Sequence, residues 1–373
     1  MKRKKKLAAG TIAAVLAASC VVCAYDGVQI YVNQEPVQAE AILYNDMTYV
    51  PLRAVGEALG ATVSWDQNTK SAYVDMSEED IVPNVIASVS DSVVAIAGNY
   101  KPDRVPDQVL AYNGAYAFGT GVVIKSGGMI LTNAHVVNGI DNLTVIFKNG
   151  ESYPATVQYM DETADLAVVK INKLGLKPIS FADESDLVVG KTVIAIGTPL
   201  SLTMRNTATK GMISGKDVAV NGEYFAYLQS DAATNSGNSG GPLVNLEGKL
   251  VGINTLGVQY ADGISLAIPV DTVKYVLNQF EQYGAVRYPD LGAAFEQPWE
   301  AKIGLPTTKG LNVVSGAGEL QAGDMVTKIN GIEVHSFTEL HEALKDTYQS
   351  GSITVTRIRN GEQSDVSITP SFS

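Results

Sequence analysis

The sequence predicts a mainly β protein of two or three domains, and three observations support this prediction. The chain has 373 residues, more than the roughly 100–200 residues of one ordinary domain. Its 46% hydrophobic and 18% charged residues, with 35 Gly and 14 Pro, are typical of a globular chain and exclude a disordered or fibrous one. Short apolar runs alternate with turn residues through the middle of the sequence, which favours antiparallel barrels or a sandwich.

The composition also excludes several classes of partner and site. Lys and Arg number 27 against 39 Asp and Glu, for a net charge of −12, and an acidic chain repels the phosphate backbone of nucleic acids. The only cysteines, Cys20 and Cys23, lie in an apolar run near the N-terminus. If that run is removed, the chain has no disulfide, no cysteine nucleophile and no thiolate metal site. We expect no metal and no other cofactor.

Residues 1–24 have the pattern of an export signal. Five basic residues, Lys2 to Lys6, precede an uncharged run from Leu7 to Ala24, and Val22 to Ala24 fits a signal-peptidase site. An uncleaved membrane anchor is the alternative, because a run of this length is at the lower limit for spanning a bilayer. In both cases the basic cluster stays in the cytoplasm. We therefore expect the rest of the chain to be secreted or anchored to the outer face of the cytoplasmic membrane.

Residues 27–76 predict a small α+β domain. The segment VQIYVN alternates as a strand does, Val50 to Gly60 predicts a short helix, and TVSWD and SAYVD predict two more strands. The pattern VPLRAVGEALGATVSWD resembles the copper amine oxidase N-terminal-like, or stalk, domain of exported bacterial proteins. The segment has no His and no Cys, so we expect a structural or cell-envelope role instead of copper binding. The acidic segment Ser77 to Asp80 is expected to be a linker.

Residues 81–286 predict a β domain that ends in a helix. Hairpin turns are expected at Ser126 to Gly128, at Asn149-Gly150 and near Glu247-Gly248. The final helix carries apolar residues at i, i+3, i+4 and i+7, with Asp271 as its expected N-cap and Gly284 as its end; the apolar residues are Val273, Val276, Leu277 and Phe280.

Residues 287–373 predict a third, α+β domain. Its expected strands GLNVV, MVTKING and SITVTRIRNGE surround one helix near Phe337 to Tyr348. Ser336 and Glu339 have the spacing of a capping box at the start of that helix.

The motif GNSGGPLV, Gly237 to Val244, is the most specific chemical signal. A serine hydroxyl needs a base to become nucleophilic, and the oxyanion that it creates needs hydrogen-bond donors. Gly237 permits the bend that aims its own N–H and that of Ser239 into one space. Taken alone, the motif is equally compatible with a glycine-rich turn that exposes a serine by chance.

Two further motifs supply a candidate base and its partner. His135, in LTNAHVVN, follows an apolar strand, and Asp165, in ETADLAVVKI, directly precedes one. A carboxylate there could hold the imidazole by its second nitrogen. Asp161 is expected to be an ordinary surface acid, and His335 and His341 to be surface or satisfied core residues.

The order His135, Asp165, Ser239 is that of the chymotrypsin fold, since other triad folds place Ser or Asp first. Segment 81–286 resembles the protease domain of the HtrA/DegP family of trypsin-like serine proteases. The matching pieces are GTGVVIKSGGMILTNAHVV, DETADLAVVKI, IAIGTPLSL, TKGMISGK, QSDAATNSGNSGGPLVN and AIPV. The resemblance implies a chymotrypsin-like double β-barrel, with His135 as general base, Asp165 as its orienting partner and Ser239 as nucleophile.

The resemblance further implies an oxyanion hole at Gly237, Asn238 and Ser239 and a primary specificity pocket near Leu256, Gly257 and Val258. Val258 favours small or medium aliphatic residues. Ser236 stands where the family usually has Pro, and Ser265-Leu266 where Gly-Phe is common. These departures affect the oxyanion loop and the pocket and leave the reaction type unchanged.

The third domain resembles the PDZ domain that follows HtrA proteases. Its carboxylate-binding loop would be Leu291, Gly292, Ala293 and Ala294, and C-terminal peptides would be its ligands. The stretch SGAGELQAGDMVTKING is shorter than usual, so a docking module that no longer binds peptide is the alternative. Family members often form homotrimers, although the sequence has no independent sign of one.

The sequence therefore predicts an exported serine endopeptidase that hydrolyses unfolded or damaged envelope proteins. The alternative is a low-turnover chaperone or peptide-binding envelope protein built on a protease scaffold, which the departure at Ser236 and the stalk domain motivate. A third reading is a structural envelope protein built around the stalk domain.

Overall fold

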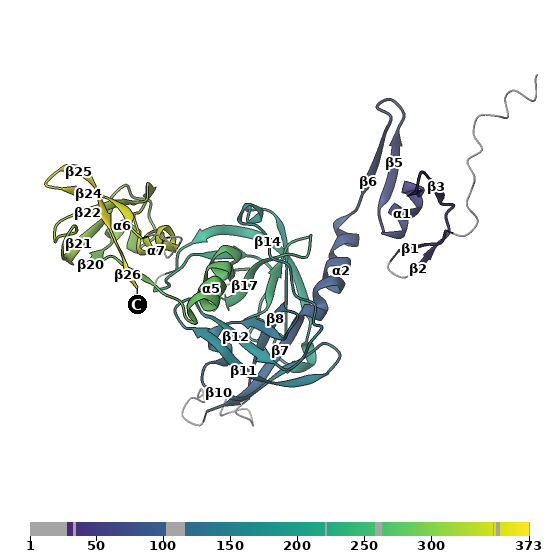
Figure 1. Ribbon diagram of the computed structural model, residues 1–373, viewed down its shortest axis with the longest axis horizontal. Coiled ribbons are helices and arrows are strands. Elements are labelled where there is room, and N and C mark those ends of the chain that lie inside the picture. The colour runs from purple at the N-terminus through teal and green to yellow at the C-terminus, as the bar shows by residue number, and fades with distance from the viewer. Residues whose placement is uncertain are drawn as a thin grey trace, which may run out of the picture. The chain divides into compact units, whose positions relative to one another are not determined.

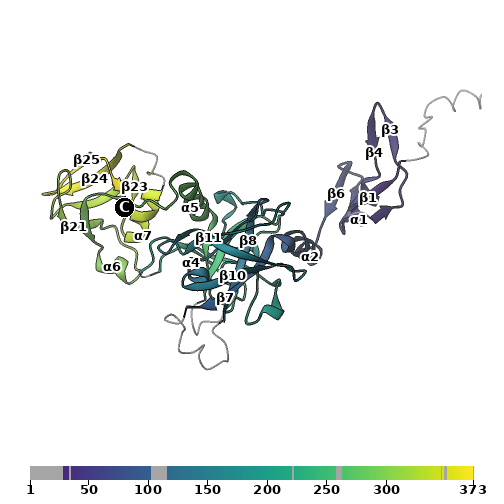
Figure 2. The ribbon, with the colours of Figure 1, turned by 60° about the horizontal axis from the view of Figure 1, so that its bottom comes forward.

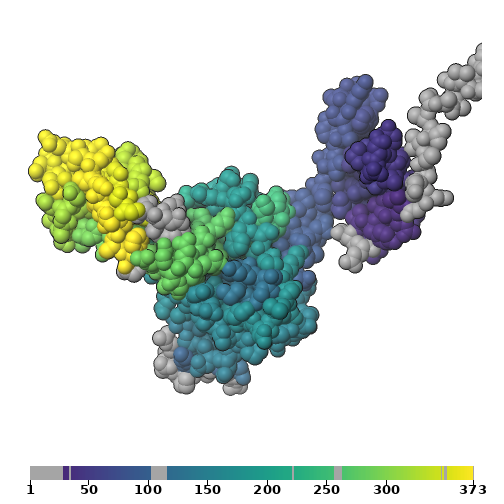
Figure 3. Space-filling model, viewed as in Figure 1, coloured from purple at the N-terminus to yellow at the C-terminus, as the bar shows by residue number. Residues whose placement is uncertain are grey.

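The computed structural model describes residues 28–32, 35–101, 116–220, 222–257, 263–345, 347 and 351–372. The chain divides into two compact units, Met1–Pro83 and Asn84–Ser373, which Figure 3 colours by residue number. The expected signal or anchor, residues 1–24, lies outside the described residues. Within the part of the chain that is described, no helix is long and apolar enough to cross a membrane.

In its described residues up to Asp75, the first unit contains three antiparallel hairpins and one helix. The hairpins pair β1 with β2, β3 with β4 and β5 with β6; the elements are β1 Ile30–Val32, β2 Glu35–Val37, β3 Ile42–Tyr44, β4 Met47–Tyr49, α1 Leu52–Ala58, β5 Thr62–Asp66 and β6 Ser71–Asp75. The expected helix and the last two strands are found. Gly56 of α1 lies so close to β5 that a Cβ atom would come within 2.5 Å of Val63 Cγ2. This contact requires glycine.

The expected linker at Ser77 to Asp80 is instead the start of a helix, α2, which spans Glu78–Val89. The Ser77 carbonyl accepts hydrogen bonds from the backbone N–H groups of Asp80 and Ile81. Three acidic residues occupy the first turn, where negative charge stabilises a helix N-terminus. The linker prediction was wrong, because the same charges favour a helix start.

Residues 93–269 form two closed antiparallel barrels of six strands each, in agreement with the expected double barrel. The first barrel comprises β7 Val93–Tyr100, β8 Tyr116–Lys125, β9 Met129–Thr132, β10 Ile140–Ile146, β11 Ser152–Asp161 and β12 Leu166–Ile171. The second comprises β13 Thr192–Gly197, β14 Thr207–Val218, β15 Tyr227–Ser230, β16 Pro242–Val244, β17 Leu250–Gly257 and β18 Ser265–Pro269. The three expected hairpin turns join β8 to β9, β10 to β11 and β16 to β17.

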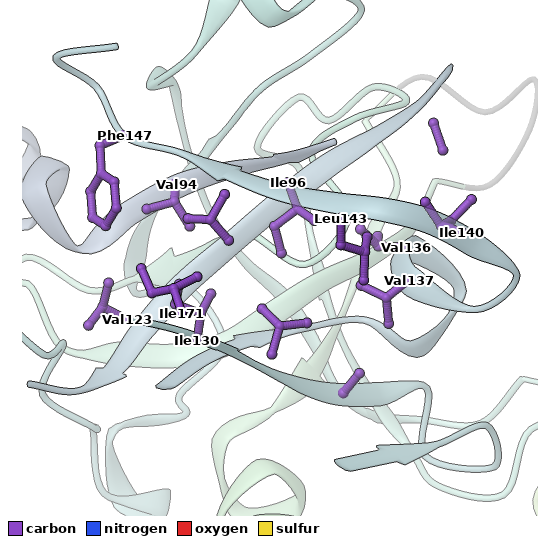
Figure 4. Packing of buried hydrophobic residues seen from close by; sticks show 14 of the residues in the cluster. Val94, Ile96, Val123, Ile130, Val136, Val137, Ile140, Leu143, Phe147 and Ile171 are labelled. Carbon is purple, nitrogen blue, oxygen red and sulfur yellow. The ribbon is translucent and has the colours of Figure 1, made fainter. Parts of the chain in front are cut away.

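Each barrel is filled by its own apolar cluster. In the first barrel, side chains from opposite strands point toward one another (Figure 4), and Ile96, Ile130 and Val145 are fully buried. The second barrel has a separate cluster that includes Ile213, Leu228 and Leu243. Removing this apolar surface from water stabilises each barrel at roughly 25 cal/mol per Å². The loops between the strands are therefore attached to two rigid barrels.

Helix α5, Val270–Tyr283, follows the second barrel and packs on β17 (Figure 1). Its end at Gly284, where φ is +78°, is as expected. The expected N-cap is wrong, because Pro269 occupies that position and Asp271 lies inside the first turn. The shorter helices are η1 Ser90–Ser92, α4 Ala134–Val137, η2 Glu184–Asp186 and η3 Leu202–Met204.

The described residues of the C-terminal domain form an antiparallel sheet with two helices. The sheet order is β20-β21-β22-β24-β25, with β23 beside β22 and a separate β19–β26 pair; the elements are β19 Pro289–Asp290, β20 Ala293–Glu296, α6 Trp299–Lys302, β21 Leu311–Gly316, β22 Met325–Ile329, β23 Ile332–Glu333, α7 Phe337–Leu344, β24 Ile353–Arg359, β25 Glu362–Ile368 and β26 Ser371–Phe372. The Ser336 hydroxyl accepts the Glu339 N–H at 3.2 Å, but the Glu339 carboxylate accepts the N–H of His335. The Ser336 half of the expected capping box is thus present, whereas the Glu339 carboxylate bonds to the residue before the N-cap.

Asp324 is the buried carboxylate of this domain. Its side chain is 1% exposed and accepts hydrogen bonds from Arg359 Nε at 2.6 Å and Arg359 Nη2 at 2.8 Å. The hydrogen bonds from Arg359, and then the Gln321 N–H, lower the pKa of Asp324 to about 2. The carboxylate is therefore ionised wherever the domain is folded near neutral pH.

We expect Asp324→Asn to lower the unfolding temperature of the second unit by about 5 °C or more at pH 7. Because the folded pKa lies below the usual value, the stabilisation is complete above about pH 4 and disappears as pH falls toward 2. Thermal unfolding of both proteins across this range measures the effect. A temperature difference that is equally large at pH 2 and pH 7 would contradict an ionised Asp324.

Candidate active site

His135 lies on α4, directly after β9, at one end of the first barrel. The helix contacts β8, β10, β11 and β12, and Figure 2 shows it beside the strands of this barrel. The side chain of Asn133, at the N-cap position, donates to the Asp165 carbonyl at 2.8 Å. Helix α4 fixes the backbone of His135. The His135 side chain is 48% exposed, so the imidazole ring is accessible to a substrate.

Asp165 occupies the turn between β11 and β12 with a left-handed backbone, at φ +50°. Its carboxylate oxygens both lie 2.9 Å from His135 Nδ1, and Oδ1 also accepts the His135 backbone N–H at 3.1 Å. In the neutral ring, a proton on Nδ1 donates to this carboxylate and leaves Nε2 free to accept one. The structure therefore brings the expected pair together. Asp161, in contrast, bonds to Ala164 and Tyr288 and makes no bond to His135 among the described residues.

Ser239 lies in the loop before β16 of the second barrel. Its neighbour Gly240 packs so closely on the first barrel that a Cβ atom would come within 2.1 Å of the Thr120 carbonyl and 2.2 Å of Thr132 Oγ1. The Thr120 N–H also donates to the Ser239 carbonyl at 2.9 Å. Through these contacts Ser239 lies next to the end of β9, the strand that His135 follows. Gly240 is needed for this approach, as its φ of +83° also indicates.

The Ser239 hydroxyl donates its proton to the Thr255 carbonyl at 2.8 Å. A hydroxyl has one proton to donate, so the serine is not hydrogen-bonded to His135 as a donor in this conformation. A rotation about the Ser239 side-chain bond is required before the imidazole can take the proton. Loose nucleophile–base geometry of this kind is common in enzymes without bound substrate.

Thr255 is a site residue that the sequence analysis did not identify. Its carbonyl accepts from Ser239, and its hydroxyl donates to Asp165 Oδ2 at 2.7 Å. It therefore contacts two of the three candidate catalytic side chains. No motif marks it, because its position depends on the pairing of β17 with the barrel and not on neighbouring residues.

The loop before Ser239 presents two backbone donors. Gly237 has φ +99°, and a Cβ atom would lie 2.2 Å from the Thr198 carbonyl. Its carbonyl accepts the Thr120 hydroxyl at 2.7 Å, which fixes the peptide. In the described part of the chain, the N–H groups of Gly237 and Ser239 donate to no acceptor, whereas that of Asn238 donates to the Asn235 carbonyl. The arrangement can accommodate an oxyanion.

Ser265, one of the two departures in this region, has a structural role. It is buried and donates to the Ala232 carbonyl at 2.9 Å, while its oxygen lies 2.7 Å from Thr234 Oγ1. These bonds fix the chain that leads to the Ser239 loop. Ser236, the other departure, is exposed, and its carbonyl accepts the Leu200 N–H at 2.8 Å.

The expected specificity pocket stays a prediction. Val258 lies outside the described residues, and Leu256 and Gly257 form the end of β17. No group of three His, Cys, Asp or Glu in the described ranges is placed to hold a metal ion.

The expected carboxylate-binding loop of the C-terminal domain is partly occupied by its own contacts. Leu291 is buried in the domain core, and the Gly292 N–H donates to Asp290 Oδ1 at 2.8 Å. Ala293 and Ala294 begin β20, which pairs only with β21 in the described sheet and so has a free edge. The Gln297 side chain, just beyond β20, accepts the Phe337 N–H at 2.9 Å. A free strand edge next to a helix is the geometry that adds a peptide strand.

Comparison with known proteins decides the family. The trypsin-like peptidase domain matches residues 119–253, the copper amine oxidase N-terminal domain residues 26–103 and the PDZ domain residues 309–369. A serine protease Do-like HtrA of Lactococcus lactis subsp. cremoris (strain MG1363) is 31% identical over 346 residues, which cover 81% of this chain and 85% of that protein. This chain belongs to the HtrA family. It is therefore a serine endopeptidase.

Other HtrA proteins agree with this assignment. The mitochondrial serine protease HTRA2 of Drosophila virilis is 34% identical over 326 residues, or 79% of this chain and 76% of that protein. Among solved structures, the HtrA-type protease AlgW with a tripeptide has a TM-score of 0.64 at 25% identity, covering 78% of this chain and 97% of AlgW. The serine endoprotease from Yersinia pestis has a TM-score of 0.58 at 29% identity, with the same coverage.

Proposed function

We propose that this HtrA-family endopeptidase cleaves peptide bonds with His135 as general base, Asp165 as its orienting partner and Ser239 as nucleophile. The observation that carries the proposal is the Asp165 carboxylate at 2.9 Å from His135 Nδ1. The loop of Ser239 packs against the strand that leads to this pair. The Asp165–His135 contact is one that a serine-protease triad requires, and the proposal adds a rotation of the Ser239 hydroxyl toward His135.

The mechanism begins when Ser239 leaves the Thr255 carbonyl and turns toward His135. Its oxygen attacks a peptide carbonyl while His135 Nε2 takes the proton. The N–H groups of Gly237 and Ser239, with Asn238 between them, stabilise the tetrahedral oxyanion. His135 then gives the proton to the leaving amine, and water releases the acyl-enzyme by the same steps.

The physiological substrates belong to this proposal as well. We infer that they are unfolded or damaged proteins of the cell envelope, because residues 1–24 have the pattern of an export signal. The PDZ domain would take C-terminal peptides at Leu291 to Ala294. A related HtrA-type protease, AlgW, has been solved with a tripeptide and with a decapeptide, which supports peptide binding. A homotrimer and an envelope contact through the stalk domain are the assemblies that we propose with it.

One observation favours a second candidate function. The Ser239 hydroxyl is bonded to the Thr255 carbonyl at 2.8 Å, as it would be in a protein that binds unfolded chains and cleaves them rarely. In that case the serine would keep this rotamer when a peptide binds. The two functions differ in whether Ser239 ever becomes nucleophilic.

Labelling with a fluorophosphonate separates the two functions, because the reagent traps only an activated serine. We expect the full chain to be labelled, with peptide mapping to Ser239, and the Ser239→Ala variant to remain unlabelled. Unfolded casein and a C-terminal peptide are added in parallel, so that a conformation induced by either is detected. No labelling under any of these conditions would favour binding over catalysis.

A further inference from the structure

The segment that joins the protease domain to the PDZ domain contains Tyr288, whose ring packs in an aromatic cluster. Tyr288 lies between α5 and β19, with its ring centroid 4.7 Å from that of Tyr224 and 6.3 Å from that of Phe225. The Tyr275 ring centroid lies 5.8 Å from that of Phe225. Aromatic pairs at such distances stabilise each other beyond the burial of their area. The ring of Tyr288 is therefore held in one place.

The hydroxyl of Tyr288 reaches the protease at Asp161. It donates to Asp161 Oδ1 at 2.5 Å, across 127 residues of sequence. The same oxygen accepts the backbone N–H of Ala164 at 2.7 Å. Among the described residues, no other side chain bonds to Asp161. One carboxylate oxygen thus links the interdomain segment to the turn between β11 and β12.

That turn carries Asp165. Asp161 is the last residue of β11, the turn occupies 162–165, and β12 begins directly afterwards. Its far end is fixed by the Asn133 side chain, which donates to the Asp165 carbonyl. Its near end is fixed by Asp161. A left-handed backbone such as that of Asp165 is strained and persists only when its surroundings hold it.

We propose that Tyr288 is a positioning residue for catalysis, which holds Asp161 and through it the turn that aims Asp165 at His135. The inference rests on the proposed roles of Asp165 and His135. Tyr288 makes no contact with the nucleophile or the oxyanion loop among the described residues, so its effect on the reaction passes through the turn.

Two further features fit this role. Burial, and then the nearby Asp161 carboxylate, raise the pKa of the Tyr288 hydroxyl far above its usual value, so the hydroxyl remains a donor wherever the enzyme is folded. The ring of Tyr224, which packs on Tyr288, also stacks on His341 of α7 at 3.5 Å, and His341 Nδ1 donates to the Tyr224 carbonyl at 3.0 Å. The cluster that supports Tyr288 is thus shared with the PDZ domain.

The test compares Tyr288→Phe with Tyr224→Phe in the full chain. The first removes only the hydroxyl that holds Asp161, and we expect kcat on a peptide substrate to fall roughly tenfold with KM unchanged. The second removes a hydroxyl from the same cluster that does not bond to Asp161, and we expect wild-type kcat. Unfolding temperatures measured for both variants exclude a simple loss of folded enzyme.

The split between kcat and KM is the readout that a purely structural role would not give. A turn that no longer aims Asp165 at His135 slows proton transfer and leaves substrate binding intact. The loss in Tyr288→Phe should therefore lie in kcat alone. An unchanged kcat, or a change in KM alone, would overturn the proposal.

A double-mutant cycle locates the effect at Asp161. Asp161→Asn keeps an oxygen that can accept both bonds, so it should retain most of the activity. Asp161→Ala removes both, and adding Tyr288→Phe to it should cause no further loss. Additive losses would show that Tyr288 acts elsewhere. If Asp165→Asn is active, the proposed triad has failed; if Asp165→Asn is inactive while Tyr288→Phe is normal, only this inference has failed.

Discussion

Ser239→Ala should abolish hydrolysis of unfolded casein, with a fall in kcat of about 10⁶. The variant removes the only atom that can form the acyl-enzyme, while the oxyanion donors of Gly237 and of residue 239 remain as backbone groups. Within the described ranges the side chain makes a single hydrogen bond, to the Thr255 carbonyl, so its loss should leave the fold intact. The measurement is casein cleavage over time, with thermal unfolding as the check on folding.

The matched control is Ser126→Ala, which changes an exposed serine in the turn between β8 and β9. We expect this control to cleave casein at the wild-type rate. If Ser239→Ala cleaves casein as well as the control does, another residue is the nucleophile and the proposed mechanism is wrong.

Asp165→Asn should reduce kcat by about 10⁴. The two carboxylate oxygens accept from the His135 N–H, from His135 Nδ1 and from the Thr255 hydroxyl. An asparagine keeps the bond to the His135 N–H when its NH₂ group takes the place of Oδ2. The NH₂ group then donates to Nδ1, which moves the ring proton to Nε2, and His135 can no longer accept the proton of Ser239.

The control for this variant is Asp141→Asn, an exposed carboxylate on β10 of the same barrel. Asp141→Asn removes one negative charge, as Asp165→Asn does, and we expect its kcat to equal that of the wild type. At high pH the Asp165→Asn variant should recover part of its activity, because hydroxide can replace the missing base. A wild-type pH–rate profile in Asp165→Asn would mean that Asp165 does not orient His135.

The sequence predicted the candidate triad because each residue lies in a short motif with its own local consequence. A glycine pair beside Ser239, an apolar strand before His135 and another after Asp165 are visible within ten residues of each. The order of the three along the chain then distinguished the chymotrypsin fold from the alternatives. The hairpin turns followed from the same local patterns, which left antiparallel barrels or a sandwich open. The double barrel was implied by the resemblance to the HtrA/DegP family, and the structure contains it.

The features that were missed depend on residues far apart in the sequence. Thr255 contacts Asp165 across 90 residues, and Tyr288 contacts Asp161 across 127, so no local pattern indicates either bond. The orientation of the Ser239 hydroxyl is a choice between side-chain rotamers, which a sequence does not specify. The acidic segment at Ser77 to Asp80 was misassigned because the same carboxylates suit a linker and a helix N-terminus.

Under the proposed mechanism, the division of the triad between two barrels has a consequence for the newly made chain. His135 and Asp165 are supplied by the first barrel, and Ser239 reaches them only through the close packing at Gly240. A nascent polypeptide that has emerged as far as β13 therefore contains a base and no nucleophile. The chain therefore becomes able to cleave peptide bonds only late in its own synthesis, after all residues of the first barrel have been made.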